Sequence, residues 1–475
     1  MRSRLSYRPA PLGSLGDVSM PRVDARSALA LGAFACVMLA QGAAIAHSPL
    51  WAAPLLGLLL FAVATDLPLV ALVSATLVVR VLTSEAISSP TAQYSGSVNL
   101  SGAIAMFFVL LAAGLLARRR RGVGVAMLGT VWLAVFTAIA VHAHGVSTES
   151  VREGVREISI LALALIVLNS RGGFSVSTAV RIVQFAGLGS ALLAIYQLAS
   201  HTGMNVEGEI RANGTFTHPN GAAMYFAIAV TASLWRYLDH GRNRSDAVMT
   251  VVFAAAAIST FSIGGLASLL AMLIAFGAMR PGSLRLKLGS CAVAALVVIA
   301  FAATPLGAKR LESEASTHVG SAQTRAGINT TLAWRIYKWR TLIPEWERAP
   351  FFGQGLGATV SAEGGTQHLV AARQPHNEYV RYAVETGLIG LLTLLCGLAL
   401  LMRALARRRR DPQLRSVATL AMAVLIGCMV NGLGDNTLLY TTTGYAAGLI
   451  IAAVLCFPVA ARPRSRRHVI AGARA

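Results

Sequence analysis

The sequence predicts an all-α fold, a polytopic bundle of 12 to 14 transmembrane helices, and three observations support it. First, the 475 residues are 55% hydrophobic and only 13% charged, which is not the composition of a soluble domain with one core. Second, apolar runs long enough to cross a bilayer as helices recur along the chain. Third, basic residues cluster between alternate runs, as they do in the cytoplasmic loops of multi-pass proteins.

Fourteen apolar runs are candidate spans. They lie at about 27–46, 49–65, 67–83, 101–117, 124–142, 155–169, 181–200, 220–238, 246–262, 264–280, 286–304, 383–403, 414–432 and 443–460. Only Asp66 interrupts the stretch 49–83, and only residues 262–265 interrupt the stretch 246–280. Each of these two pairs is either a re-entrant hairpin or one long tilted helix, so twelve spans are the alternative.

The order of these runs divides the chain into five parts. We expect a cytoplasmic basic N-terminus at 1–26, transmembrane helices with short loops at 27–304, a large extracytoplasmic loop at 305–382, C-terminal transmembrane helices at 383–460 and a cytoplasmic basic tail at 461–475.

The formal net charge of +21 is at first sight typical of a nucleic-acid-binding protein, but membrane topology explains it better. If both termini are cytoplasmic, 28 of the 41 Lys and Arg residues lie on the cytoplasmic side. This is the distribution that the positive-inside rule describes. We therefore expect contacts with membrane lipids and no nucleic-acid partner.

The predicted outer loop at 305–382 is the exception to that rule. Its nine basic residues are Lys309, Arg310, Arg325, Arg335, Lys338, Arg340, Arg348, Arg373 and Arg381. A loop of this length in a compact protein is usually functional, and guanidinium groups bind pyrophosphate through paired hydrogen bonds. The alternative is that these residues form ion pairs with Glu312, Glu314, Glu345, Glu347 and Glu363.

Part of this loop has the periodicity of an amphipathic helix. Apolar side chains at 332, 336, 339 and 343 share one helical face, whereas Arg335 and Lys338 lie on another. We expect this helix to lie along the membrane surface.

A histidine stands where the loop is predicted to re-enter the membrane, in the segment Gln374-Pro375-His376-Asn377-Glu378. Imidazole titrates near neutral pH and is the side chain most often used as a general base. The alternative for His376 is a helix cap or a hydrogen-bonded loop residue. Glu378 and Asp435 are the next carboxylates to consider as a base.

Three other polar positions are candidates for binding. Arg211 lies in a second outer loop, where an anionic ligand and an ion pair with Glu207 or Glu209 are equally good explanations. Arg80 is close enough to the end of a span to reach a lipid phosphate, although packing alone also explains it. Asp435, at the sequence Asn431-Gly432-Leu433-Gly434-Asp435, has the features of a turn or cap residue and is also suited to bind sugar hydroxyls.

Three separated motifs, covering about 205–400, resemble those of the bacterial O-antigen ligase and polymerase family of membrane glycosyltransferases. The first is Arg211, Gly214-Thr215-Phe216 and Pro219-Asn220, beside which we interpret His218 as a polar cap; the second is Arg335 to Trp339, Pro350 and Gly353-Gln354-Gly355-Leu356-Gly357; the third is His376-Asn377 with Glu385-Thr386-Gly387. Members commonly have Ser-Arg where this chain has Ser262-Ile263. An arginine that some members use is therefore absent here.

The resemblance implies an enzyme of the bacterial inner membrane, with both termini cytoplasmic. Its donor would be a glycan linked to a polyprenyl pyrophosphate such as undecaprenyl pyrophosphate, and its acceptor a hydroxyl of a glycan, a lipid or a protein. Such an enzyme polymerises or ligates O-antigen, capsule or exopolysaccharide of the cell envelope. His376 would be the general base of an inverting transfer, and the binding residues would be Arg211, Arg335, Arg340, Arg381, Asn377 and Arg80.

The motifs that the sequence lacks narrow the chemistry further. It contains no Asp-x-Asp, no metal-ligand spacing, no phosphate-binding P-loop and no Gly-x-Ser-x-Gly elbow. We therefore expect a metal-independent reaction without a cofactor, in which arginines neutralise the leaving pyrophosphate. The rival function is a polysaccharide or lipid-linked-glycan transporter or flippase, which the lack of an inverted repeat and the single large outer loop disfavour.

Overall fold

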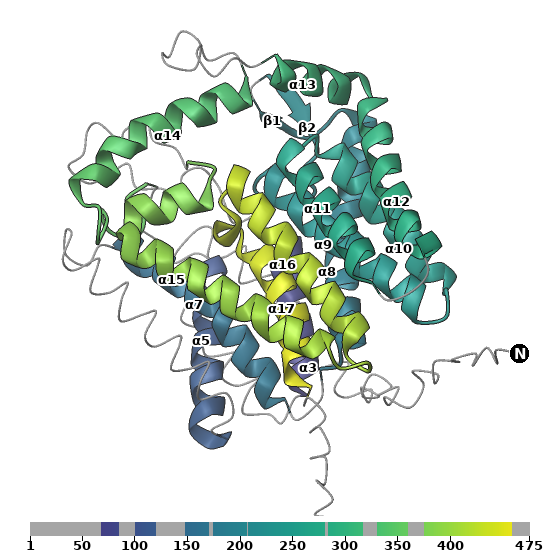
Figure 1. Ribbon diagram of the computed structural model, residues 1–475, viewed down its shortest axis with the longest axis horizontal. Helices are drawn as coiled ribbons and strands as arrows, with labels where there is room; N and C mark the ends of the chain where they lie inside the picture. The colour runs from purple at the N-terminus through teal and green to yellow at the C-terminus, as the bar shows by residue number, and fades with distance from the viewer. Residues whose placement is uncertain are drawn as a thin grey trace, which may run out of the picture.

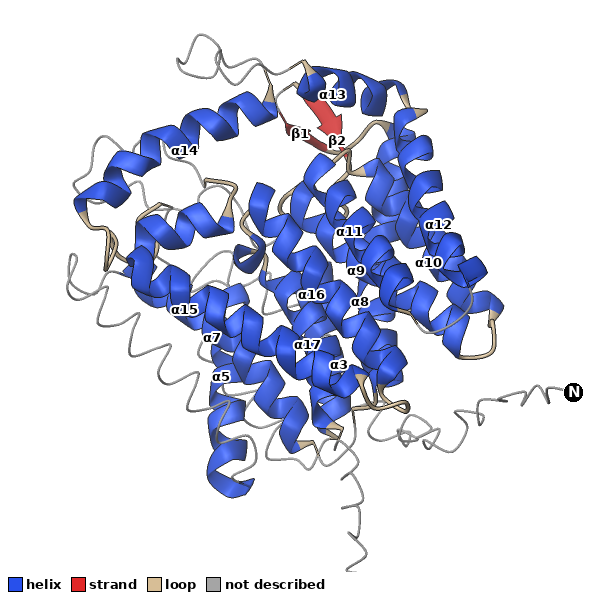
Figure 2. Ribbon diagram, viewed as in Figure 1, coloured by secondary structure: helices blue, strands red, loops and turns tan. Residues whose placement is uncertain are grey.

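The computed structural model describes residues 68–84, 100–119, 148–170, 174–206, 208–280, 284–316, 330–359 and 375–457. Most of these residues are helical, and the helices pack into one bundle (Figure 2). The elements are α3 Leu69–Leu82, α5 Leu100–Arg119, α7 Thr148–Asn169, α8 Val176–Ser200, β1 Met204–Val206, β2 Glu209–Arg211, α9 Pro219–Asp239, α10 Arg244–Ser259, α11 Ile263–Met279, α12 Leu284–Ala302, α13 Pro305–Ala315, α14 Thr331–Arg348, α15 Glu378–Arg409, α16 Arg415–Gly434, η5 Thr437–Leu439 and α17 Thr441–Cys456.

Most of the predicted apolar runs are helices in the structure, and they follow the predicted order. The runs at 27–46, 49–65 and 124–142 lie outside the described residues. The stretch 246–280 is not one long helix, because it divides into α10 and α11 at a break that includes Phe261, whose φ is +48°.

Length and apolar composition identify the helices that could cross a membrane. Among the described residues these are Val176–Ser200, Glu378–Arg409 and Arg415–Gly434, with a fourth if Lys287–Ala302 and Pro305–Ala315, which meet at 96°, form one bent span. The helices α3, α11 and α17 are apolar but shorter. The described part of the chain is therefore that of a helical membrane protein, and the total of 12 to 14 spans stays a prediction.

Helix α9 is the centre of the bundle. Every side chain from Pro219 to Arg236 is buried, and the helix packs against α8, α10, α11, α16 and α17. Small residues make this possible, since they let helix backbones approach closely. A Cβ added at Gly265 of α11, for example, would lie 2.2 Å from the Cβ of Ala223.

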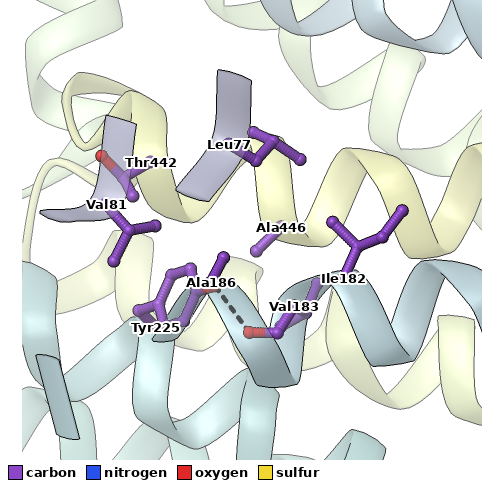
Figure 3. Close-up of a pocket in the computed structure, with 8 residues that line it drawn as sticks. All are labelled: Leu77, Val81, Ile182, Val183, Ala186, Tyr225, Thr442 and Ala446. Carbon is purple, nitrogen blue, oxygen red and sulfur yellow. Dashed lines mark hydrogen bonds between the residues drawn. The ribbon is translucent and has the colours of Figure 1, made fainter. Parts of the chain in front are cut away.

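The bundle contains a narrow apolar pocket between α3, α8, α9 and α17 (Figure 3). The hydroxyl of Tyr225 donates a hydrogen bond of 2.8 Å across its edge to the carbonyl oxygen of Val183. The pocket has no space for even a water molecule, so we interpret it as a packing gap and not as a substrate site.

The hairpin β1–β2, α13 and α14 gather at one end of the bundle, and α14 crosses that end (Figure 1). Two contacts fix where α14 begins. Arg310 of α13 pairs with Glu209 of β2 at 2.9 Å, and the Glu314 carboxylate accepts a hydrogen bond of 2.9 Å from the backbone N–H of Leu332. Thus the stretch predicted to be a large outer loop contains two helices. Whether α14 lies on a membrane surface stays a prediction.

Helix α15 begins earlier than the apolar run at 383–403 predicts. The side chain of Asn377 accepts hydrogen bonds from the backbone N–H groups of Tyr379 and Val380, both at 3.0 Å, and so caps a helix that starts at Glu378. Arg381 was expected in the loop and is therefore helical. The first turns of α15 come before the apolar run because capping, and not hydrophobicity, sets where this helix starts.

A backbone break at Gly387 bends α15 and receives the glycine-rich turn that follows α14. Gly387 has a φ of +64°, and residues on both sides of it hydrogen-bond to the turn. The backbone N–H of Gln354 donates to the Val384 carbonyl at 2.8 Å, and that of Leu388 donates to the Pro350 carbonyl at 2.8 Å. These glycines therefore bring one backbone close to another.

Replacing Gly387 with alanine should destabilise the protein by more than about 2 kcal/mol. Its added Cβ would lie 2.3 Å from the backbone of Phe351, at a φ that side chains disfavour. Gly397→Ala is the matched control on the same helix, since nothing lies within 4 Å of its added Cβ. The test compares the melting temperatures of the two purified variants with that of wild type in detergent. Equal effects of the two substitutions would contradict the docking of the turn on Gly387.

Candidate active site

His376 lies under α14, at the end of the bundle where the chain enters α15. Its Nδ1 is 2.8 Å from Oδ1 of Asp435, the residue that ends α16, and its side chain is 20% exposed. Its φ of +49° is in the left-handed region, where a residue other than glycine is held only if its surroundings fix it. This histidine is therefore a constrained residue in contact with a second titratable group.

The neighbours of His376 supply that constraint. The indole N–H of Trp339 donates to the Pro375 carbonyl at 2.8 Å, and the ring of Trp334 meets the imidazole edge-on at 5.5 Å. On the other side, the backbone N–H of Asn377 donates to Oδ1 of Asn436 at 3.1 Å. Helix α14 and the loop after α16 thus hold the histidine from two sides.

The contact with Asp435 determines which ring nitrogen of His376 can act as a base. In neutral imidazole one nitrogen carries the proton, so Nδ1–H donates to the carboxylate and Nε2 keeps its lone pair. The Asp435 carboxylate also accepts from the Asn436 backbone N–H at 2.8 Å and from the Tyr440 hydroxyl at 3.2 Å. Burial alone would raise the pKa of Asp435, but His376, Arg335 and His218 lower it more, and the net pKa is well below the usual value. Asp435 therefore stays ionised and can stabilise an imidazolium at His376.

Arg335 approaches this pair from α14. Its Nη1 lies 3.7 Å from the position that a Cβ on Gly434 would take, and its charge lowers the pKa of Asp435. Among the described residues no carboxylate pairs with Arg335 within 4.0 Å, and its Nε is buried without a hydrogen-bond partner. A half-buried guanidinium without a counter-ion is suited to an anionic ligand.

Arg211 reaches the same region from β2. It is 3% exposed, and it donates from Nε to the Thr260 carbonyl at 2.8 Å and from Nη2 to Oδ1 of Asn220 at 3.0 Å. The ion pair with Glu209 that was the alternative explanation is not formed, since Glu209 pairs with Arg310 and Lys309. Glu207 lies outside the described residues. Ser262, where family members have Ser-Arg, donates to the same Asn220 oxygen at 2.9 Å.

His218 is the cap of α9 and faces the site as well. Its Nδ1 accepts a hydrogen bond of 3.2 Å from the backbone N–H of Asn220, which agrees with its predicted role as a polar cap. Its ring centre is 6.2 Å from that of His376. Burial is the main cause that lowers the pKa of His218 to about 4; Asp435 raises it, and Arg211, His376 and Arg335 lower it further.

Arg381 differs from these arginines because carboxylates surround its guanidinium group. It is 0% exposed and forms ion pairs with Glu157 of α7 at 2.7 Å and with Glu385 at 3.2 Å. A third pair joins it to Glu378, and its guanidinium stacks on Tyr382 at 4.9 Å. These contacts favour a structural role, and the substrate-binding role stays a prediction.

The structure does not bring the other predicted binding residues together around His376. Arg340 is exposed on α14, and Arg80 is buried in α3, where its Nη2 donates to the Thr441 hydroxyl at 3.1 Å. Asn377 is next to His376, but its side chain is engaged in capping α15 and in donating to the Leu433 carbonyl at 3.0 Å. Their binding roles stay predictions.

Among the described residues, no three His, Cys, Asp or Glu side chains are grouped so that they could hold a metal ion. The chemistry that the visible groups can perform is proton transfer at His376, assisted by Asp435, beside two guanidinium groups.

Residues 248–395 match the family model of the O-antigen ligases. This stretch, which is less than half of the chain, is similar to the O-antigen ligases. The match confirms the resemblance and includes Arg335, His376 and Arg381, whereas Arg211, His218 and Asp435 lie outside it. A comparison of the chain with curated proteins gives no match. The O-antigen ligase match supports a membrane enzyme that processes glycans, and nothing in it supports a transporter.

The structural role of Arg381 predicts a large loss of stability in Arg381→Ala. Removing the guanidinium leaves three buried carboxylates without their counter-ion, which costs about 3–5 kcal/mol. Arg340→Ala, at an exposed position, should change the melting temperature little. Thermal unfolding in detergent is the measurement. A stable Arg381→Ala protein that has lost only substrate binding would instead support the predicted binding role.

Proposed function

We propose that this protein is a membrane glycosyltransferase that transfers a glycan from a polyprenyl pyrophosphate to an acceptor hydroxyl. His376 Nε2 removes the proton from the acceptor hydroxyl, the oxygen forms a bond to the anomeric carbon, and the bond from that carbon to the phosphate oxygen breaks. The polyprenyl pyrophosphate leaves with the bonding electrons. Attack from the side opposite the leaving group inverts the anomeric centre, and neither a metal ion nor a cofactor takes part.

The single observation that supports this proposal best is the pair of His376 and Asp435 beside Arg335, with which no carboxylate of the described residues pairs. The buried carboxylate holds the imidazole by a hydrogen bond of 2.8 Å, in the tautomer whose Nε2 accepts a proton. It also stabilises the positive charge that the imidazole gains in the reaction. A base of this kind contributes about 10²–10⁴-fold to a rate.

The arginines supply the second half of the proposed chemistry. Arg335 has no counter-ion among the described residues, and we assign it to the pyrophosphate together with Arg211. A planar guanidinium binds phosphate oxygens in pairs and stabilises the charge that grows as the leaving group departs. We assign Arg340, which is exposed on α14, a secondary role in binding the same anion from the solvent side.

We further propose that this end of the bundle faces outward from the inner membrane, with both termini in the cytoplasm. The distribution of basic residues supports this orientation. The acceptor is then the growing glycan of a polymerase, or the lipid core or protein of a ligase. In a deletion strain the lipid-linked donor should accumulate on the outer face of the membrane. Accumulation on the cytoplasmic face would instead indicate a transporter.

Replacing His376 with alanine or glutamine should reduce glycan transfer at least about a thousandfold, because neither side chain is a useful base. Asp435→Asn should lower the rate less severely, since the imidazole remains but loses its ionised partner. Transfer by purified protein from lipid-linked donor, followed by product gel and mass spectrometry, measures both. Near wild-type transfer by a well-folded His376→Gln protein would remove the histidine from the mechanism.

Arg335→Ala should lower transfer about a hundredfold, and Arg335→Lys should recover only part of it, because an ammonium cannot reproduce the planar fork. The matched control is Arg348→Ala on the same helix, whose side chain is 62% exposed and already paired with Glu345. Initial rates at unchanged protein levels are compared. Equal, mild losses at 335 and 348 would mean that the charges on α14 are only solvated surface.

A further inference from the structure

We propose that His218 binds the diphosphate of the donor through its Nε2–H as an uncharged hydrogen-bond donor. This inference rests on the proposed function and assigns His218 a specific part of the same site. Because His218 acts by binding, its role differs from that of His376, which exchanges a proton. Three features of the structure lead to it.

The first feature is the tautomer of His218. Its Nδ1 accepts a hydrogen bond from the Asn220 backbone N–H at 3.2 Å, so this nitrogen must keep its lone pair and the proton of the neutral ring lies on Nε2. Protonating Nδ1 would remove the cap of α9. Burial keeps the ring neutral in addition, since it lowers the pKa of His218 to about 4. The ring is therefore a donor at Nε2 throughout the range from pH 5 to 8.

The second feature is the surroundings of the His218 ring. The imidazole centres of His218 and His376 are 6.2 Å apart, and Asp435, Arg211 and Arg335 are the other charged groups that act on His218. Nε2 has no hydrogen-bond partner among the described residues and is not sealed from its surroundings. A polar group in such a place needs a partner, and a ligand can provide it.

The third feature distinguishes the diphosphate from the acceptor. Asn220 joins His218 to Arg211, because its backbone N–H donates to the imidazole while its side-chain oxygen accepts from the guanidinium at 3.0 Å. His218 thus lies on the arginine side of the site, at the N-terminus of α9, where the helix dipole favours an anion. A neutral imidazole at a helix N-terminus also acts as a hydrogen-bond donor in triosephosphate isomerase.

Two substitutions separate this role from capping. His218→Asn places an oxygen where Nδ1 was and keeps the cap, but it has no group at the Nε2 position. His218→Gln places an N–H donor near the Nε2 position but caps a helix poorly. The matched control for a lost cap is Asn243→Gln, because the Asn243 side chain accepts from the Ser245 backbone N–H at 3.1 Å and caps α10. Asn243 is at the opposite end of α9 from His218, roughly 30 Å away along that helix.

The experiment measures the binding of undecaprenyl pyrophosphate to the full-length protein in nanodiscs, by isothermal titration calorimetry, together with melting temperatures. We expect His218→Asn to melt like wild type and to bind about ten- to a hundredfold more weakly, since a hydrogen bond to a charged group is lost. His218→Gln should melt lower, like Asn243→Gln, and bind within a few-fold of wild type. In transfer assays His218→Asn should leave the KM for the acceptor unchanged.

Three results would overturn the proposal, and they are distinguishable. Unchanged binding together with an unchanged acceptor KM in His218→Asn would leave His218 as a cap only. Normal binding with a raised acceptor KM would assign it to the acceptor. If wild type and His376→Gln both fail to bind undecaprenyl pyrophosphate, the donor in the proposed function is wrong, and the proposal for His218 is wrong with it.

Discussion

The interaction on which the site most depends is the buried ion-pair cluster around Arg381. This guanidinium joins Glu378 and Glu385 of α15 to Glu157 of α7, so it fixes the first turns of α15 against the bundle. Glu378 also accepts a hydrogen bond of 2.9 Å from the backbone N–H of Leu438, which ties the loop after α16 to the same cluster. His376 precedes α15 and Asp435 lies in that loop, so one set of charges determines where both members of the pair can be.

A second constraint positions α14, the helix that carries Arg335. The glycine turn after α14 docks on the break at Gly387, while Glu314 of α13 holds the first turn of α14. Both ends of α14 are thereby attached, and its middle, with Trp334 and Trp339, packs on the segment at His376. The glycines of this turn act in packing one backbone against another, because only a residue without a Cβ allows two backbones to approach this closely.

The sequence predicted the helices well because hydrophobic runs and caps are local. A motif also made His376 a candidate base, and that role stays a prediction. The partner of His376 was harder to predict, since Asp435 is 59 positions away and an aspartate after a Gly-rich segment is usually a turn residue. Arg381 shows the same limit. Its place among the basic residues of the stretch 305–382 suggested a ligand contact, and no local pattern connects it with its ion-pair partner Glu157, 224 positions away.

Among the described residues, Arg335 differs from several other arginines in having no carboxylate partner. Four arginines are each paired with a carboxylate: Arg236, Arg280, Arg310 and Arg381. The attraction within each pair offsets the free-energy cost of removing both charges from water. Arg335 has no such partner among the described residues, although it is half-buried and lies beside the ionised Asp435. An unmatched buried charge lowers stability and is retained where a ligand supplies the counter-ion. Among the described residues, Arg335 is thus the arginine beside His376 and Asp435 that no carboxylate pairs with.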